Sequence, residues 1–378
     1  MPSFFLFNTN PDSMFDFYIH ENIAKAETLP ASFYREDSVF EALKKRVFRH
    51  SWQWQGCAQE LFPVDDYVQP MSFLEGFIEE PVFLKKNSEN EEINCFSNVC
   101  THRGNLIFHN ECRSKRIACG YHGRQWRKDG QLKFMPEFND VEDFPRACDH
   151  LTKYPSAKLG THVFTSLNPA FSIDAVFDKM KERIGFLPLE QFKYDATHSK
   201  DYLINCHWAL YCDNYLEGFH IPFVHDDLNE VLDYGSYQTE LFDNGSLQIG
   251  YSKGGEDVFE FPEGHPDQGK HVAAYYYWIF PNMMFNFYPW GLSINIVKPL
   301  SKNKTRVVFR SFVWDSSKLS DGAGAVLDKV EREDEFVVEG VHKGLQSHTY
   351  QTGRFSPTRE QGVHHFHRLL AKHLKKEA

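Results

Sequence analysis

The sequence has no long hydrophobic run, few cysteines and too little positive charge to balance its acids. Its longest apolar stretch, at 271–280, is too short to span a bilayer, and residues 1–7 lack the basic start and cleavage site of a secretory signal. Only 8 of 378 residues are Cys, which excludes a disulfide scaffold and predicts thiols, free or metal-bound, in a reducing cytoplasm. The formal net charge of -11 argues against nucleic acid or a membrane surface as a partner.

The length and composition predict a globular chain of more than one domain. A chain of 378 residues exceeds what one hydrophobic core usually serves. Hydrophobic residues make up 42% and charged residues 25%, which is ordinary for a globular protein. The aromatic share is high, at 16% with 35 Phe, and indicates an interior with aromatic walls.

We predict three parts along the chain. Residues 1–48 form a helical lead-in that packs on the catalytic domain, with a helix over 38–48 that Ser38 could cap. Residues 49–158 show short strands and frequent turns, including a hairpin signal at Asp129-Gly130, and predict a small all-β domain. Residues 159–378 form the last domain.

The last domain has the pattern of an antiparallel sheet combined with helices. The expected strands cover 247–251, 272–280, 284–298 and 305–314, and the expected helices cover 206–221, 325–348 and 362–378. The fold class is therefore predicted to be α+β.

Two loops in the β domain combine Cys with His. Cys100-Thr-His102 and Cys119-Gly-Tyr-His122 each offer one thiolate and one imidazole, and each loop ends in Gly, which permits a tight turn. If the two Cys bind one iron and the two His another, the result is a Rieske [2Fe–2S] centre. A zinc site is the alternative, but zinc motifs usually pair Cys with Cys and His with His.

A second metal site is indicated by the segment 214–225, which places Glu217, His220 and His225 in an apolar run. Buried imidazoles need a partner, and a metal suits two neutral imidazoles. A non-heme iron site needs two His, one carboxylate and open positions for O2. In the helix expected at 325–348, Asp334 is the acid in line with the apolar stripe, which predicts Asp334 as the third ligand. The alternative is an acid in a salt bridge.

With these motifs the sequence resembles the Rieske non-heme iron oxygenases. Arg103 and Gly104 match the residues usual after the first His, whereas Gly120 and Arg124 stand where Pro and Trp are common. The resemblance implies a small all-β Rieske [2Fe–2S] domain and a helix-grip (START-like) catalytic domain with an antiparallel sheet. It also implies that Asp334 is the third iron ligand. Glu217 would connect the iron site to a Rieske His of a neighbouring subunit, and Asn214 would support it.

Further segments narrow the resemblance to the choline monooxygenases. They are 277–290, 333–345, 353–354 and 364–367, so the resemblance covers nearly the whole chain. A quaternary ammonium substrate favours aromatic faces, and the candidates are Trp278, Phe280, Phe285, Phe287 and Trp290, although aromatics on strands are usually core. The cluster His364, His365 and His367 is interpreted as packing and surface.

The functional hypothesis is a terminal oxygenase that hydroxylates a small organic compound with O2, such as a choline-, betaine- or carnitine-like amine. A separate reductase or ferredoxin would supply NAD(P)H electrons, and the resemblance implies a homotrimer. The alternatives are an aromatic ring-hydroxylating dioxygenase or demethylase, and a Rieske electron carrier fused to a ligand-binding module without iron chemistry.

Overall fold

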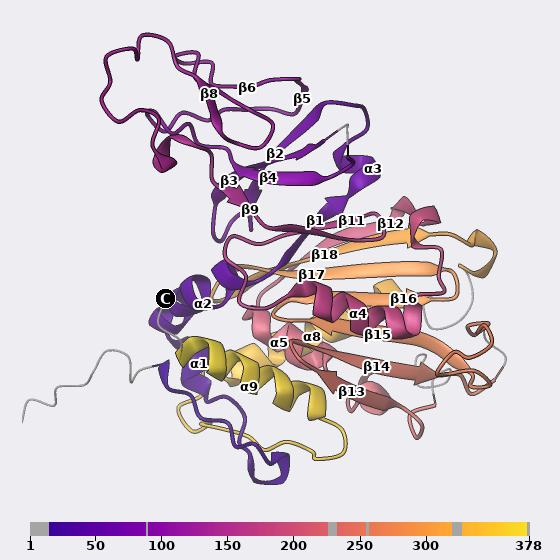
Figure 1. Ribbon diagram of the computed structural model, residues 1–378. Helices are drawn as coiled ribbons and strands as arrows, with labels where there is room; N and C mark the ends of the chain where they lie inside the picture. Colours follow the sequence, from indigo (N-terminus) through magenta and orange to yellow (C-terminus); the bar gives the residue numbers. More distant parts are fainter. Residues whose placement is uncertain (1–14, 88–89, 226–232, 255–256, 320–326, 376–378) are drawn as a thin grey trace, which may run out of the picture.

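The computed structural model describes residues 15–87, 90–225, 233–254, 257–319 and 327–375. It has an upper lobe of short strands and long loops above a larger lobe built on one wide sheet (Figure 1). Helices α1 (Ala31–Arg35) and α2 (Asp37–Arg46) pack on the larger lobe, beside α9 (Gln361–Lys375). None of the helices in these residues is long and apolar enough to cross a membrane.

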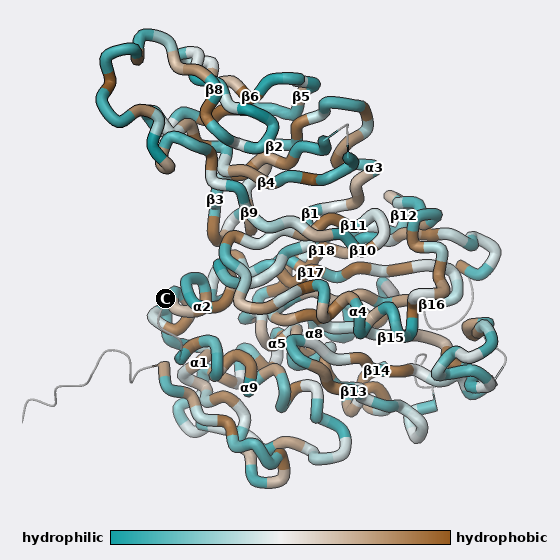
Figure 2. The backbone as a smooth tube through the Cα atoms, in the orientation of Figure 1, coloured by the Kyte–Doolittle hydropathy of each residue, from teal (hydrophilic) through white to brown (hydrophobic). Residues whose placement is uncertain are grey.

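The upper lobe holds two small antiparallel sheets around a core of its own. The first has the order β5-β2-β3-β4-β9 and the second the order β6-β7-β8. Phe83, Phe96 and Phe108 form the aromatic centre of this core. The outer loops are mainly hydrophilic (Figure 2). The strands are β2 (Tyr67–Phe73), β3 (Glu80–Lys86), β4 (Ile93–Ser97), β5 (Cys112–Arg113), β6 (Ile117–Ala118), β7 (Gln125–Trp126), β8 (Leu132–Phe134) and β9 (Lys153–Tyr154).

A three-stranded sheet lies where the chain enters and leaves the upper lobe. Strand β1 (Gln53–Cys57) and strand β10 (Ser156–Leu159) pair with opposite edges of β11 (His162–Thr165). The short helix α3 (Ala58–Leu61) follows β1. Single-turn 3-10 helices occur at Ile23–Lys25, Phe48–His50, Ala147–Asp149, Leu189–Gln191 and Ser316–Lys318.

The larger lobe is a seven-stranded antiparallel sheet with helices on both faces. The strand order is β12-β18-β17-β16-β15-β14-β13. Helix α4 (Ile173–Ile184) covers one face, and α5 (Trp208–Tyr215), α8 (Leu327–Gly344) and α9 cover the other. The predicted α+β class is confirmed. The strands are β12 (Lys193–Ile204), β13 (Gln238–Phe242), β14 (Gly245–Tyr251), β15 (Val272–Ile279), β16 (Met283–Tyr288), β17 (Gly291–Ser301) and β18 (Lys304–Val313).

Alternation along the strands decides which residues meet which helices. In β15, Tyr275 and Tyr277 belong to the core under α4, whereas Trp278 packs with Phe366 of α9 on the other face. Successive strand residues point to opposite faces, so both faces of this sheet are buried.

Three local expectations were wrong. The run 284–298 is two strands, because Pro289-Trp290 form a two-residue turn between Tyr288 and Gly291. That turn carries apolar residues instead of the usual Asn-Gly signal. Ser38 does not cap its helix, which begins one residue earlier behind Glu36. The helix expected over 206–221 ends at Tyr215.

Candidate metal centres

The two histidines predicted as iron ligands, His220 and His225, lie on either side of a single helical turn. Helix α5 ends at Tyr215, and α6 (Ile221–Val224) begins after a short turn, with Pro222 in its first turn. Proline is accepted there because the first N–H groups of a helix have no internal partner. His220 precedes this turn and His225 follows it, and their ring centres lie 5.1 Å apart.

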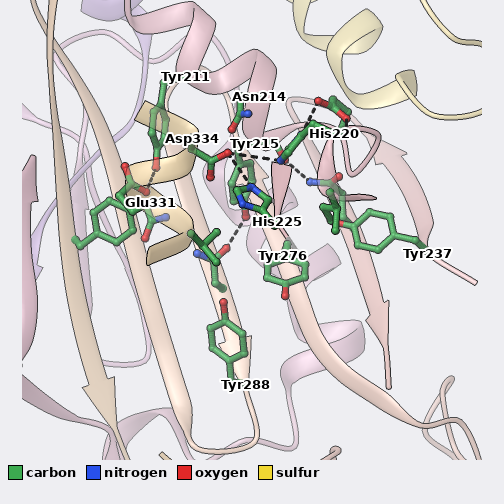
Figure 3. A pocket seen from close by; sticks show the side chains of 17 residues that line it. Tyr211, Asn214, Tyr215, His220, His225, Tyr237, Tyr276, Tyr288, Glu331 and Asp334 are labelled. Carbon is green, nitrogen blue, oxygen red and sulfur yellow. Dashed lines mark hydrogen bonds and ion pairs between the residues drawn. The ribbon is translucent and has the colours of Figure 1, made fainter. Parts of the chain in front are cut away.

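Asp334 of α8 faces both imidazoles (Figure 3). Its Oδ1 atom lies 3.0 Å from Nε2 of His225 and 3.6 Å from Nε2 of His220. One ligand atom from each of the three residues can be chosen so that all lie within 4.8 Å of one another. The structure therefore brings together the three residues that the sequence predicted as iron ligands.

The other nitrogen of each imidazole is held by a carboxylate. His220 Nδ1 lies 2.7 Å from Glu217 Oε1, and His225 Nδ1 lies 2.7 Å from Glu333 Oε2. Burial lowers the pKa of His225, but its bonds to Asp334 and Glu333 outweigh burial and raise it. Metal-bound histidines typically have this arrangement, in which an outer partner orients the ring. The donor set, two imidazoles and one carboxylate, fits non-heme iron.

Glu217 is placed by the turn and not by a helix. Glu217 and His220 both fall inside the helix expected over 206–221, but residues 216–220 are outside α5 and α6. The Oε2 atom of Glu217 accepts hydrogen bonds from the backbone N–H groups of Phe219 and His220. The carboxylate is thus fixed by the loop, with 14% of its side chain exposed.

Sequence reasoning missed the role of Glu333. It lies beside the apolar stripe of α8 and was not predicted to take part in the site, yet it reaches the buried ring of His225. The feature of the sequence that could have indicated this role is that Glu333 directly precedes the predicted ligand Asp334. Successive residues of a helix point about 100° apart, so two neighbouring acids can approach one imidazole from two sides.

A cavity of about 120 Å³ opens at the three predicted ligands. One water needs roughly 10–15 Å³ on the same measure, so the cavity has room for a small organic molecule. Its walls combine tyrosines, amides and carboxylates (Figure 3). The lining residues are Tyr211, Asn214, Tyr215, Glu217, His220, Ile221, His225, Tyr237, Gln248, Tyr276, Asn286, Tyr288, Asn295, Phe309, Val330, Glu331 and Asp334.

The five aromatics suggested for a substrate cage do not line this cavity. Phe285 and Phe287 of β16 belong to the core under α4, while Asn286 and Tyr288 face the cavity. The reason is the two-residue period of a strand, which sends neighbours to opposite faces. The aromatic wall is instead made of five tyrosines, among them Tyr276 of β15, together with Phe309.

The two Cys–His loops lie in the upper lobe and share one backbone geometry. Gly104 donates its N–H to the carbonyl of Cys100 at 2.9 Å, and Gly123 donates to Cys119 at 3.1 Å. Both glycines have positive φ, 71° and 72°, which other residues adopt only with strain. The two loops therefore turn in the same way.

The side chains of these loops form a matching donor set. Cys100 and Cys119 are buried, and the rings of His102 and His122 lie 4.8 Å apart. The Nδ1 atom of His102 is buried without a hydrogen-bond partner. Two buried thiols and two neighbouring imidazoles, one of each from each loop, fit a cluster with one sulfur-bound and one nitrogen-bound iron.

Arg124, which replaces the more usual Trp, is buried beneath the second loop. Its guanidinium donates to Asp149 Oδ1 at 2.6 Å. The carbonyl of Asp149 also accepts from Thr101 of the first loop and from Trp126. Asp149 therefore connects both loops to β7.

The histidine cluster near the C-terminus has the structural role that its pattern indicated. His364 and His365 bond to the carbonyls of His20 and Phe242, and His367 pairs with Asp213 at 2.9 Å. Within the described ranges, the two imidazoles and Asp334 form the one group of three or more potential ligands that gather closely enough to hold a single ion.

The fold and these centres define an oxidoreductase with a Rieske-type lobe and a catalytic lobe that holds a mononuclear metal site. Residues 57–145 match the family model for the Rieske [2Fe-2S] domain. Residues 188–376 match the model for the ring hydroxylating alpha subunit (catalytic domain). The chain therefore belongs to the Rieske non-heme iron oxygenases, which carry a [2Fe–2S] cluster and use O2 at a mononuclear iron.

Relatives of known activity cover almost the full chain. The chain is 31% identical to the chloroplastic choline monooxygenase of Arabidopsis thaliana, over 93% of this chain and 84% of that protein. It is 27% identical to the carnitine monooxygenase oxygenase subunit of Escherichia coli K12, over 97% and 99% of the two chains. The structure of the quaternary ammonium Rieske monooxygenase CntA has the same fold, with a TM-score of 0.71, 20% identity and coverage of 93% and 96%.

Proposed function

We propose that this chain is the oxygenase component of an enzyme that hydroxylates a small quaternary amine. His220, His225 and Asp334 would hold the iron, and Cys100, His102, Cys119 and His122 would hold the cluster. One observation carries the proposal: the cavity at the three iron ligands has tyrosine walls and carboxylates, and no Lys or Arg is among its described lining residues.

The cavity wall suits a quaternary ammonium group. Such a cation has no N–H to donate, and aromatic faces attract it by about 0.5–2 kcal/mol each. Tyr215, Tyr237, Tyr276 and Tyr288 supply these faces. The relatives named for choline and carnitine act on amines of this kind, which supports the same substrate class here.

A bound iron would supply activation of O2, so that one oxygen atom enters a C–H bond of the substrate. The other oxygen atom leaves as water, which consumes two electrons and two protons. The protein residues orient the site: Glu217 and Glu333 hold the Nδ1 sides of the two imidazoles and leave their Nε2 atoms facing Asp334. Asn214 lines the cavity beside them and would support this arrangement.

The electrons would come from NAD(P)H through a partner reductase or ferredoxin, which docks at the Rieske lobe. We also propose a head-to-tail homotrimer, in which the Rieske loops of one subunit approach Glu217 of the next. Within one chain these loops lie in the upper lobe, apart from α5 and α8 of the larger lobe (Figure 1). The inter-subunit electron transfer described for CntA supports this arrangement.

The exposed apolar side chains agree with such an assembly. Phe223 and Phe336 are 78% and 82% exposed on the outer side of the iron site, and Tyr121 beside His122 is 61% exposed. Large exposed aromatics of this kind are typical of protein interfaces. A cytoplasmic location is part of the proposal, because none of the eight cysteines, all among the described residues, forms a disulfide.

The alternatives are less well supported. An aromatic hydrocarbon gains little from three carboxylates in its cavity, and the relatives reported above act on quaternary amines. A Rieske electron carrier without iron chemistry has no use for two imidazoles and a carboxylate that meet at a cavity.

A single-turnover experiment tests the proposal without the partner reductase. The iron-loaded protein is reduced chemically, freed of reductant and exposed to O2 with choline, glycine betaine, carnitine or an aromatic acid. We expect hydroxylated product from a quaternary amine, and no product from Asp334→Ala, which keeps its cluster spectrum. Product from the aromatic acid alone would contradict the substrate class, and unchanged turnover in Asp334→Ala would contradict the iron ligands.

A further inference from the structure

Glu331 is a buried carboxylate on the cavity wall. It lies in α8, one helical turn before Asp334, with 4% of its surface exposed. Its Oε2 atom accepts a hydrogen bond from the hydroxyl of Tyr211 at 2.6 Å, whereas its Oε1 atom is buried with no partner. Burial raises the pKa of Glu331 well above the usual range. A carboxylate in this environment is costly unless a cation joins it.

The other acids of the cavity already have partners. Asp334 faces two imidazoles, and Glu217 is bound by one imidazole and two backbone N–H groups. Glu331 is the remaining carboxylate among the described lining residues. A second oxygen, Oε1 of Gln248, is also buried without a hydrogen bond. Both oxygens attract positive charge, and the tyrosine faces add to this preference.

We propose that Glu331 is the counter-ion of the substrate's ammonium group and that it selects cations without a carboxylate. This inference rests on the proposed function, and it separates the choline-like amino alcohols from the zwitterions of the betaine and carnitine type. A zwitterion would bring its own carboxylate into a cavity that holds Glu331 and whose described lining has no Lys or Arg. Like charges in a poorly solvated space repel, so the same residue attracts one class and rejects the other.

The test measures binding to the iron-loaded protein under anaerobic conditions, by calorimetry, so that turnover plays no part. Three probes of similar size are compared: choline, its neutral carbon isostere 3,3-dimethyl-1-butanol, and glycine betaine. On the unmodified protein we expect choline to bind about tenfold more tightly, or better, than either of the others. This comparison needs no variant. Equal affinity for choline and its isostere would overturn the inference.

A variant then assigns the effect to one side chain. Glu331→Gln keeps the shape and the bond to Tyr211 but removes the charge. We expect it to weaken choline binding about tenfold or more, with binding of the neutral isostere unchanged. The matched control is Glu335→Gln, an acid of the same helix outside the cavity wall, which should leave all three affinities unchanged.

The outcomes separate this inference from the proposed function. If choline and glycine betaine bind equally well, and Glu331→Gln changes neither, the quaternary amine function stands and the role of Glu331 is wrong. If no quaternary amine binds while an aromatic acid does, the proposed function fails and the inference fails with it.

Discussion

The Nδ1 atom of His225 lies 2.7 Å from a carboxylate oxygen of Glu333, while the Nε2 atom of the same ring lies 3.0 Å from Asp334. Two consecutive residues of α8 thus hold both nitrogens of one buried imidazole. This contact fixes which nitrogen faces the predicted iron position. It also makes the geometry of the site depend on an acid that is not itself a predicted ligand.

Replacement of Glu333 by Ala is expected to weaken iron binding about 10–100-fold, because the ring of His225 loses the partner that orients it. The measurement is the iron dissociation constant, by competition with a chelator. Glu335→Ala serves as the control, since Glu335 makes no contact with the imidazoles in the structure described above. An iron affinity equal to that of the unmodified protein would show that Glu333 does not position His225.

Removal of the buried ion pair of Arg124 and Asp149 is expected to destabilise the upper lobe. Their side chains are only 2% and 12% exposed. Removal of one member of a buried pair leaves an uncompensated charge and costs about 3–5 kcal/mol. We therefore expect Asp149→Ala to unfold at lower urea concentration and to lose its [2Fe–2S] absorbance first.

The exposed pair Lys153 and Glu92 provides the control for that experiment. The two side chains are 47% and 50% exposed, and Glu92→Ala should change the stability by less than about 1 kcal/mol. Equal unfolding midpoints for Asp149→Ala and Glu92→Ala would contradict the structural role of the buried pair.

Because of the buried His207, we expect the folded protein to lose stability in mild acid. It is fully buried among Phe33, Tyr34 and Phe40, and burial lowers its pKa to about 3. The unfolded chain binds a proton near the ordinary His pKa of about 6.5 and the folded chain does not. This residue therefore stabilises the fold above about pH 6.5, and the contribution is lost as the pH falls.

Between pH 7 and pH 5 this contribution decreases by about 2 kcal/mol. His207→Asn keeps an acceptor for the N–H of Ala209 but cannot be protonated, so its unfolding free energy should fall less steeply over the interval. His348→Gln, at an exposed position, should keep the original slope. Urea unfolding at several pH values gives the slopes, and identical slopes for all three proteins would refute the prediction.

The proposed trimer is tested by mass in solution. We expect a particle of three times the 44.2 kDa chain mass. Phe336→Asp places a charge on the exposed apolar surface beside the iron site and should shift the particle towards the monomer mass. Leu203→Asp, an exposed apolar position on β12, is the control. A strictly monomeric protein that turns over substrate would contradict the head-to-tail arrangement.

Much of the chemistry could be predicted from the sequence because ligand types and short spacings are local properties. The Cys–His loops indicated a Rieske centre, and in the upper lobe both Cys are buried and the rings of His102 and His122 lie 4.8 Å apart. The apolar stripe of one helix singled out Asp334, which does face His220 and His225. The boundaries near residues 48 and 158 stay a prediction.

The helix that was expected through Glu217 failed for a local reason. The segment after Tyr215 has the composition of the helix before it, but Gly218 and Pro222 divide it into a turn and a second short helix. Within the turn, the carboxylate of Glu217 still contacts His220, both at its backbone N–H group and at its ring nitrogen Nδ1.

By itself, the sequence determined which residues are predicted to bind the two metal centres, because paired Cys–His loops, two imidazoles and an acid on an apolar stripe carry the ligand types that these metals need. Only the tertiary structure decided what surrounds them. Because successive residues of a strand point to opposite faces of the sheet, Tyr276 and Tyr288 face the cavity and Phe285 faces away from it. The packing of α8 against the sheet places Glu331 on the cavity wall. These choices depend on how α5 and α8 lie against the sheet, and contacts over more than a hundred residues leave no mark in a local pattern.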